Sequence, residues 1–280
     1  MKRMQQSSAS RALSGVRRLL RAYPSLLRVG LADMLAYRAE FLVWILSMNM
    51  PLVMMALWTA VAADGPMGRF GQREFVAYYL GMLIVRILTG SWLVWELTME
   101  IRRGTLAIRL LRPIHPLWAF SAMQLAAVPM RALVISPLIV VLYWIAGARL
   151  PMHDPERLAI VFASIAGAWL LLFLVMAIVG MLAAYIESAL SVFDLWLGAQ
   201  AILSGFLVPL ELMPAWVARL ARVLPFRYIL GFPVETLIGL ESKTVALREL
   251  GIQWLFVATA LAMTLLLWRK ALRRFAAFGG

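Results

Sequence analysis

The sequence predicts an all-α integral membrane protein, a helical bundle with six transmembrane helices. Hydrophobic residues occupy 63% of its 280 positions and charged residues only 15%, a balance typical of lipid-embedded chains and not of water-soluble domains. Apolar runs of about 20 residues recur along the chain, and a helix of that length crosses the roughly 30 Å hydrocarbon core of a bilayer.

Six apolar runs define the predicted transmembrane domain, residues 41–268. They cover residues 41–63, 75–96, 117–146, 158–182, 192–210 and 250–268. An even number of spans places both termini on the same side of the membrane. Lysine and arginine outside the spans are more numerous on that side than on the other, and basic loops stay in the cytoplasm. We therefore expect both termini to be cytoplasmic.

Residues 1–40 are expected to form a basic cytoplasmic tail that contains an amphipathic interface helix. Within residues 11–23, apolar side chains share one arc of a helix and arginines share the opposite arc. The apolar arc comprises Leu13, Val16, Leu19, Leu20 and Tyr23, and the basic arc comprises Arg11, Arg17, Arg18 and Arg21. Such a helix lies in the membrane interface with its arginines on lipid phosphates. The alternative is a solvated tail that only sets the topology. Residues 269–280 form a second basic cytoplasmic tail.

Residues 211–249, between the fifth and sixth predicted spans, are expected to form an outer or re-entrant segment with short helices. Pro214 suits a first helical turn, and the residues from there to 224 group apolar side chains against two arginines. Prolines and glycines break the rest into short pieces. Irregular backbone of this kind is tolerated at membrane depth only where other protein covers it.

Catalytic and metal-binding motifs are not found in the sequence. There is no cysteine, and the two histidines, His115 and His153, lie in loops on predicted opposite faces of the membrane. None of the three lysines follows the glycines of a P-loop, so the chain cannot hold ATP in that way. The net charge of +13 comes without a nucleic-acid motif, which makes anionic lipid the expected partner. We expect no catalytic residue, metal or cofactor in this chain.

The loop of residues 97–116, on the expected cytoplasmic side, is the most informative stretch. It combines acidic and basic side chains with Gly104, which can end a helix, and Pro113, which forces a new chain direction. This composition predicts a short, rigid elbow. The alternative is a tight turn whose arginines only set the topology.

Two separated motifs resemble those of type 2 ABC exporter permeases. The first is Glu100-x-x-x-Gly104-Thr105-Leu106, followed by Leu110-Leu111 and Arg112-Pro113-Ile114. The second runs from Ser204 to Trp216 and continues in Leu224-Pro225-Phe226-Arg227-Tyr228. Both stand at the corresponding places of a six-span frame. The likeness is closer to a bacterial branch described as ABC-2 family transporter proteins, and it departs from the family at Ala107, where members commonly have glutamate.

The resemblance implies the permease subunit of an ATP-driven ABC exporter in the bacterial cytoplasmic membrane. The implied substrate is hydrophobic or amphipathic: a lipid, glycolipid, polysaccharide or drug-like molecule. A separate ATPase subunit would bind ATP and Mg²⁺, and a second permease, the same chain or a six-span sister, would complete the pathway. In the family the first motif forms the coupling helix that docks on the ATPase. This assigns ATPase coupling to Glu100, Arg102, Arg103, Gly104, Thr105, Arg109, Arg112 and Pro113.

Arg86 and Arg131 fall near the middle of the second and third predicted spans. An unpaired cation there costs at least about 2.5–3.5 kcal/mol, so each arginine must face protein, water or an anion. At a similar depth the two could bind an anionic head group in a substrate pathway. The alternative is pairing with Glu96, Glu187 or Asp194, or snorkelling to the membrane surface.

An ion-coupled secondary transporter is the alternative function. It calls for acidic or histidine side chains deep in the spans, whereas Asp194 and Glu96 lie close to the predicted cytoplasmic ends. A further alternative, a membrane subunit that transports nothing, leaves both motifs without a role.

Overall fold

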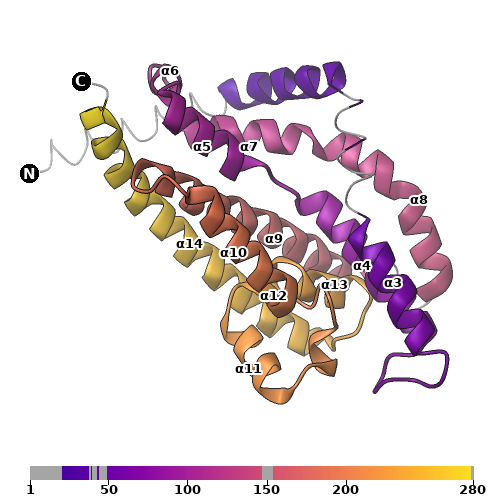
Figure 1. Ribbon diagram of the computed structural model, residues 1–280. Helices are drawn as coiled ribbons and strands as arrows, with labels where there is room; N and C mark the ends of the chain where they lie inside the picture. Colours follow the sequence, from indigo (N-terminus) through magenta and orange to yellow (C-terminus); the bar gives the residue numbers. More distant parts are fainter. Residues whose placement is uncertain (1–20, 38, 40–42, 44–48, 147–153, 279–280) are drawn as a thin grey trace, which may run out of the picture.

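The computed structural model describes residues 21–37, 39, 43, 49–146 and 154–278. It is all-helical, with 81% of residues in helices and no strand in these ranges, which confirms the predicted class. Figure 1 shows one elongated bundle. The short helix α6 (Leu106–Leu110) and the helix of residues 21–36 lie at one end, and α11 (Ala215–Val223) lies at the other.

Four helical units are long and apolar enough to cross a membrane. They run over Gln72–Arg103, Pro116–Ile145, Pro155–Ala184 and Lys243–Arg274, and they match the second, third, fourth and sixth predicted spans. The first and fifth predicted spans correspond to shorter apolar helices, α3 (Met50–Val61) with 12 residues and α10 (Ala189–Leu203) with 15. Six crossings therefore stay a prediction.

Two of the long units each consist of two helices. Residues 90–92 separate α4 (Gln72–Thr89) from α5 (Leu93–Arg103). A turn at Ala127 separates α7 (Pro116–Ala126) from α8 (Val128–Ala146), and the two run in different directions in Figure 1. Pro129 has no N–H group for a helical bond to the residue four positions earlier, which explains the interruption at Ala127.

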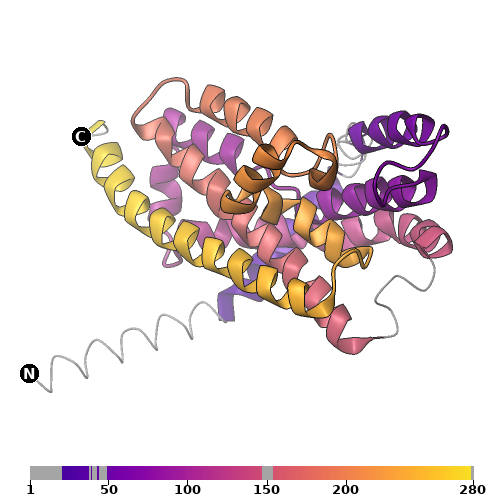
Figure 2. The ribbon, with the colours of Figure 1, turned by 90° about the horizontal axis from the view of Figure 1, so that it is seen from below.

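The long helix α9 (Pro155–Met181) lies at the centre of the bundle and continues into a 3₁₀ turn, η3 (Leu182–Ala184). It packs along α14 (Lys243–Phe278), and the two helices lie side by side in Figures 1 and 2. A Cβ atom on Gly167 would stand only 2.9 Å from the Gln253 side chain. The glycine thus lets Gln253 reach the carbonyl oxygen of Ser164, to which its Nε2 donates at 2.9 Å.

The helix of residues 21–36 packs against α7 at the same end of the bundle as α6 (Leu106–Leu110). The Tyr23 hydroxyl lies 3.1 Å from the Ser121 hydroxyl, and its ring meets the Trp118 ring edge-on. A Cβ atom on Gly30 would meet Ala126 at 2.8 Å, so the two helices touch closely there. Residues 11–20, which hold most of the predicted interface helix, lie outside the described residues.

The chain between α10 and α14 forms short helices. They are η4 (Leu210–Leu212), α11 (Ala215–Val223), α12 (Phe226–Ile229) and α13 (Gly231–Leu237). α11 leaves Trp216 exposed, whereas Tyr228 of α12 and Phe232 of α13 are buried. α12 and α13 pack on α9, and α13 also packs on α4. α12 and α13 are thus covered by the bundle, as irregular chain in an apolar solvent requires, whereas α11 stays largely exposed.

Candidate functional site

An arginine from another helix stabilises the break between α4 and α5, which comprises residues 90–92. The last carbonyl groups of α4 have no partner within the helix, because α4 ends at Thr89. Arg131 of α8 is 2% exposed, and its Nη1 donates to the carbonyl oxygens of Gly90 at 2.6 Å and Leu88 at 3.3 Å. A cation at a helix C-terminus also interacts favourably with the helix dipole. Arg131 therefore stabilises the break.

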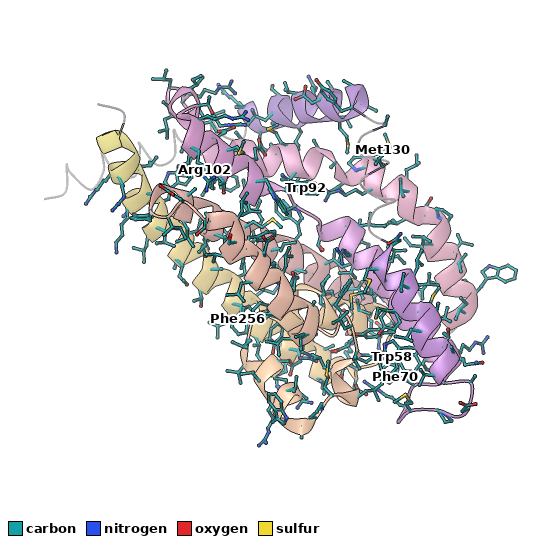
Figure 3. The ribbon with its side chains drawn as sticks, viewed as in Figure 1. Trp58, Phe70, Trp92, Arg102, Met130 and Phe256 are labelled. Carbon is teal, nitrogen blue, oxygen red and sulfur yellow. The ribbon has the colours of Figure 1, made fainter. Side chains whose placement is uncertain are left out.

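A cavity of 440 Å³ lies beside this break. Residues of the break form one part of its lining, and α9 and α10 supply other parts. Its aromatic lining residues are Trp92, Trp95, Phe193, Trp196 and Phe206. Figure 3 shows Trp92 at the junction of α4 and α5. A concave, largely aromatic cavity with a few polar groups is the usual form of a small-molecule site.

Arg86 is the charged residue among those that line the cavity. Its guanidinium carbon lies 4.7 Å from the centroid of the Phe206 ring, a cation–π contact. No described residue pairs with Arg86 through a hydrogen bond or a salt bridge. Arg131 is not part of the lining. The two intramembrane arginines thus have different surroundings: Arg86 faces the cavity, and Arg131 binds the backbone of the break.

The elbow, residues 97–116, forms the second candidate site at the α6 end of the bundle. α5 continues through Arg103 and ends at Gly104, whose φ of 74° is left-handed, the conformation that glycine favours just after a helix. α6 begins two residues later. The predicted loop is therefore mostly helical, because the second span extends through it as α5.

The elbow presents a mixed basic and apolar surface. Its exposed residues include the predicted Arg102, Arg103, Gly104, Thr105, Arg112 and Pro113. Figure 3 labels Arg102 toward this end of the bundle. The most exposed large apolar side chains there are Ile108 at 60% and Leu111 at 86%. An exposed apolar patch with a charged rim is typical of a protein interaction site.

Glu100 and Arg109 face each other within the elbow and do not join the exposed set. The Nε of Arg109 donates to both Glu100 carboxylate oxygens at 2.7 and 2.8 Å, and its Nη2 donates to Glu96 at 2.9 Å. The guanidinium carbon also lies 4.3 Å from the centroid of the Phe120 ring. Hydrogen bonds between a guanidinium and carboxylates are charge-assisted and therefore strong. They tie α6 to α5 and to α7.

A groove of 1380 Å³ adjoins the elbow. Arg102 and Arg103 line it together with Tyr185, Glu187 and Arg274, which come from the η3–α10 connection and from α14. The Arg274 guanidinium carbon lies 5.2 Å from the centroid of the Tyr185 ring. The exposed basic surface of the elbow is therefore continuous with a basic groove.

A buried charge cluster joins α12, α13 and α14, and sequence reasoning missed it. Arg227 donates to Glu235 at 2.6 Å and to Glu249 at 2.7 Å, and the Tyr228 hydroxyl donates to Glu249 at 2.9 Å. Burial alone would lower the pKa of Arg227, but the charges and hydrogen bonds of the two glutamates raise it. Burial and the hydrogen bond to Glu249 raise the pKa of Tyr228 to about 12.

A sequence signal for this cluster exists. Arg227 stands in a segment that is otherwise apolar, and the first carboxylates that follow it along the chain are Glu235, Glu241 and Glu249. A charge in such a segment must be paired. Within the described residues, no group of three or more histidine, aspartate or glutamate side chains could hold a metal ion.

Comparison with known proteins gives one family. The model of the family described as ABC-2 family transporter protein matches residues 48–279. This range includes the break, the cavity, the elbow and the buried charge cluster. Among curated proteins, no match was found.

Proposed function

This chain belongs to the ABC-2 transporter family, whose members are membrane components of ABC transporters, and from this premise we propose that it is the permease subunit of an ATP-driven exporter. A separate ABC ATPase would bind ATP and Mg²⁺ and dock on the elbow. The observation that carries the proposal is the exposed surface of α6 and its flanks.

The exposed side chains of the elbow indicate which ATPase surface would fit. Leu111 and Ile108 project apolar groups, which gain free energy when a partner buries them. Arg102, Arg103 and Arg112 surround them with positive charge. We therefore propose an apolar notch with an acidic rim on the ATPase, with the adjoining basic groove as part of the same contact.

The contacts within the elbow provide a route from the ATPase to the membrane. A push on α6 would pass to α5 because Arg109 binds Glu96 and Glu100. α5 leads directly to the break at Gly90, where three non-helical residues can absorb a change of direction. Movement of α5 about the break would change the cavity that Trp92 and Trp95 line.

The complete transporter would contain two permease subunits, identical or paired with a sister chain, in the bacterial cytoplasmic membrane with both termini inside. Because the chain has no cysteine, a single introduced cysteine can be labelled without background. Leu111→Cys should react with a membrane-impermeant maleimide only from the cytoplasmic side of vesicles, and Trp216→Cys only from the outer side. Labelling of both variants from one side would contradict six spans.

The docking role can be tested with two charge changes of equal size. Arg102→Glu/Arg103→Glu should lower copurification of the ATPase with the permease at least about tenfold, as loss of a central contact does. Arg219→Glu/Arg222→Glu is the matched control, because these arginines are exposed on α11 at the opposite end of the bundle. Equal ATPase recovery with all three proteins would exclude docking at the elbow.

Transport itself is tested in vesicles that contain the permease with and without the copurified ATPase. The proposal expects substrate movement only with ATPase and ATP. Movement driven by an ion gradient in the absence of ATP would instead support the ion-coupled secondary transporter. Leu111→Asp should reduce transport while the isolated permease keeps its thermal stability, because the Leu111 side chain is 86% exposed.

A further inference from the structure

We propose that the cavity beside the α4–α5 break binds a compact amphiphile with a single negative charge, a carboxylate or phosphodiester group on an apolar or aromatic body. The inference rests on the proposed function and deepens it, because it names the substrate class of the permease. Three features of the lining support it: an accessible cation, a polar side chain without a partner, and a continuous aromatic wall.

The cation is Arg86, which sits within a membrane-spanning unit. Its guanidinium group makes a cation–π contact with the Phe206 ring. No described carboxylate neutralises its charge, and no described carbonyl group accepts a hydrogen bond from it. A guanidinium in lipid needs an anion or water to offset its desolvation. Its planar set of donors matches carboxylate and phosphate oxygens. The cavity is therefore built to receive an anion at this position.

Gln200 of α10 provides an independent sign of a ligand. Its side chain lines the cavity and is only 8% exposed. No described residue forms a hydrogen bond with its amide group. The amide atoms do not belong to the fully buried atoms without a partner, so they open to the cavity and need a polar group there. A ligand oxygen in the cavity would satisfy the amide, and Gln200 would then fix the orientation of the ligand.

The aromatic wall indicates what the rest of the ligand is. Trp95 meets Phe193 edge-on at a centroid distance of 4.8 Å, and Phe193 stacks on Trp196 at 5.6 Å. Trp92 adjoins Trp95 at 4.9 Å. Such a wall binds apolar or ring-shaped groups through burial and ring contacts. The ligand is thus amphipathic, with its charge at Arg86 and its body on the tryptophans.

The charge of the lining and the volume of the cavity narrow the class of ligand further. Because Arg86 supplies one positive charge and Arg131 is directed to the backbone of the break, a second negative charge on the ligand would be buried without compensation. The volume of 440 Å³ lies in the lower part of the about 300–1000 Å³ range of small-molecule sites. A compact monoanion fits these limits.

The test uses the permease alone, in nanodiscs of zwitterionic phosphatidylcholine, without ATPase or ATP. The probes are pyrene butyrate and its uncharged amide, and binding is followed by saturable energy transfer from tryptophan to pyrene. The wild-type protein should bind the carboxylate at least about tenfold more tightly than the amide. Arg86→Gln should remove this preference, and Arg73→Gln, an exposed arginine on the same helix, should keep it.

A second reading of the wild-type data and one further variant keep the proposal falsifiable. If Arg86→Gln does not fold, the wild-type preference for the carboxylate decides alone. Trp196→Phe should lower the energy transfer because it removes a donor from the wall. Equal binding of carboxylate and amide by the wild type, or an equal loss of binding in the Arg73 and Arg86 variants, would overturn the proposal. Neither result bears on ATP-dependent transport, so the proposed function is judged separately.

Discussion

Arg131 Nη1 donates a hydrogen bond of 2.6 Å to the carbonyl oxygen of Gly90, across 41 positions of sequence. A buried arginine thus replaces the hydrogen-bond partners that α4 lacks where it ends. This contact explains how a span can be interrupted inside an apolar environment. It also places the interruption beside the cavity, because Gly90 belongs to the cavity lining.

Replacing Arg131 with methionine should destabilise the isolated permease by about 2–3 kcal/mol. Methionine fills similar space but leaves the Gly90 and Leu88 carbonyl groups without their donor, and hydrogen bonds to charged groups contribute about 1.5–3 kcal/mol. Denaturant unfolding in micelles, followed by circular dichroism, measures the difference. Arg112→Met, at an exposed arginine, should change stability by less than about 0.5 kcal/mol. Equal effects of the two changes would contradict the role of Arg131.

The sequence predicts the long apolar helices well, because hydropathy depends on local composition. It places their ends less well. α14 starts at Lys243, seven positions before the predicted span, and it includes Glu249. Hydropathy ended the span there because it counts Glu249 as an exposed charge, whereas the fold pairs Glu249 with Arg227, 22 residues away.

The fifth predicted span is too long at its C-terminal end, whereas the sixth is too short at its N-terminal end. The apolar run continues to residue 210, but α10 ends at Leu203. Gly205 has a left-handed φ of 83°, which turns the chain within an apolar run that hydropathy treats as continuous. Hydropathy does not reveal the break at Gly90 either, because this stretch is also apolar. The residue that stabilises the break, Arg131, lies on another helix. The end of α5 at Gly104 follows from local sequence, because glycine favours the left-handed conformation just after a helix.

Loss of Arg227 should destabilise the protein more than any other single change in the buried charge cluster. Arg227→Met leaves the buried Glu235 without its cation and Glu249 with only the exposed Arg248, and breaking such a pair costs about 3–5 kcal/mol. The triple variant Arg227→Met/Glu235→Gln/Glu249→Gln removes the uncompensated charges. It should therefore recover part of the loss in a thermal unfolding experiment. A triple variant less stable than the single one would show that charge balance is not the cause.

The conformation of Gly104 should be needed for coupling. Alanine in a left-handed conformation costs about 1–2 kcal/mol, and asparagine tolerates it better. A Cβ atom at Gly104 meets no atom within 4 Å, so the cost is backbone strain and not crowding. Gly104→Ala should lower transport per ATP hydrolysed, and Gly104→Asn should lower it less. Gly251→Ala is the control, because that helical glycine also has open space around it. Identical coupling in all three variants would contradict the prediction.

His115 should make the stability of the elbow depend on pH. It is the N-cap of α7, and its Nδ1 accepts a hydrogen bond from the Leu117 N–H at 3.3 Å. Loss of surrounding water, with its ring 4.9 Å from the Trp268 ring, lowers the pKa of His115 below its usual 6.5. The folded state therefore favours the neutral imidazole. The stability that the neutral His115 cap adds is present above pH 6.5 and is lost as the pH falls through the lowered pKa.

Asparagine at this position separates the cap from the titration, since it caps helices well and carries no titrating group. His115→Asn should have a melting temperature close to that of the wild type at pH 7.5. On acidification to pH 5.5 the wild type should lose more thermal stability than the variant, because only the imidazole becomes protonated and gives up its acceptor. If both proteins lose the same amount, other groups account for the acid sensitivity, and the cap of α7 does not depend on the charge of His115.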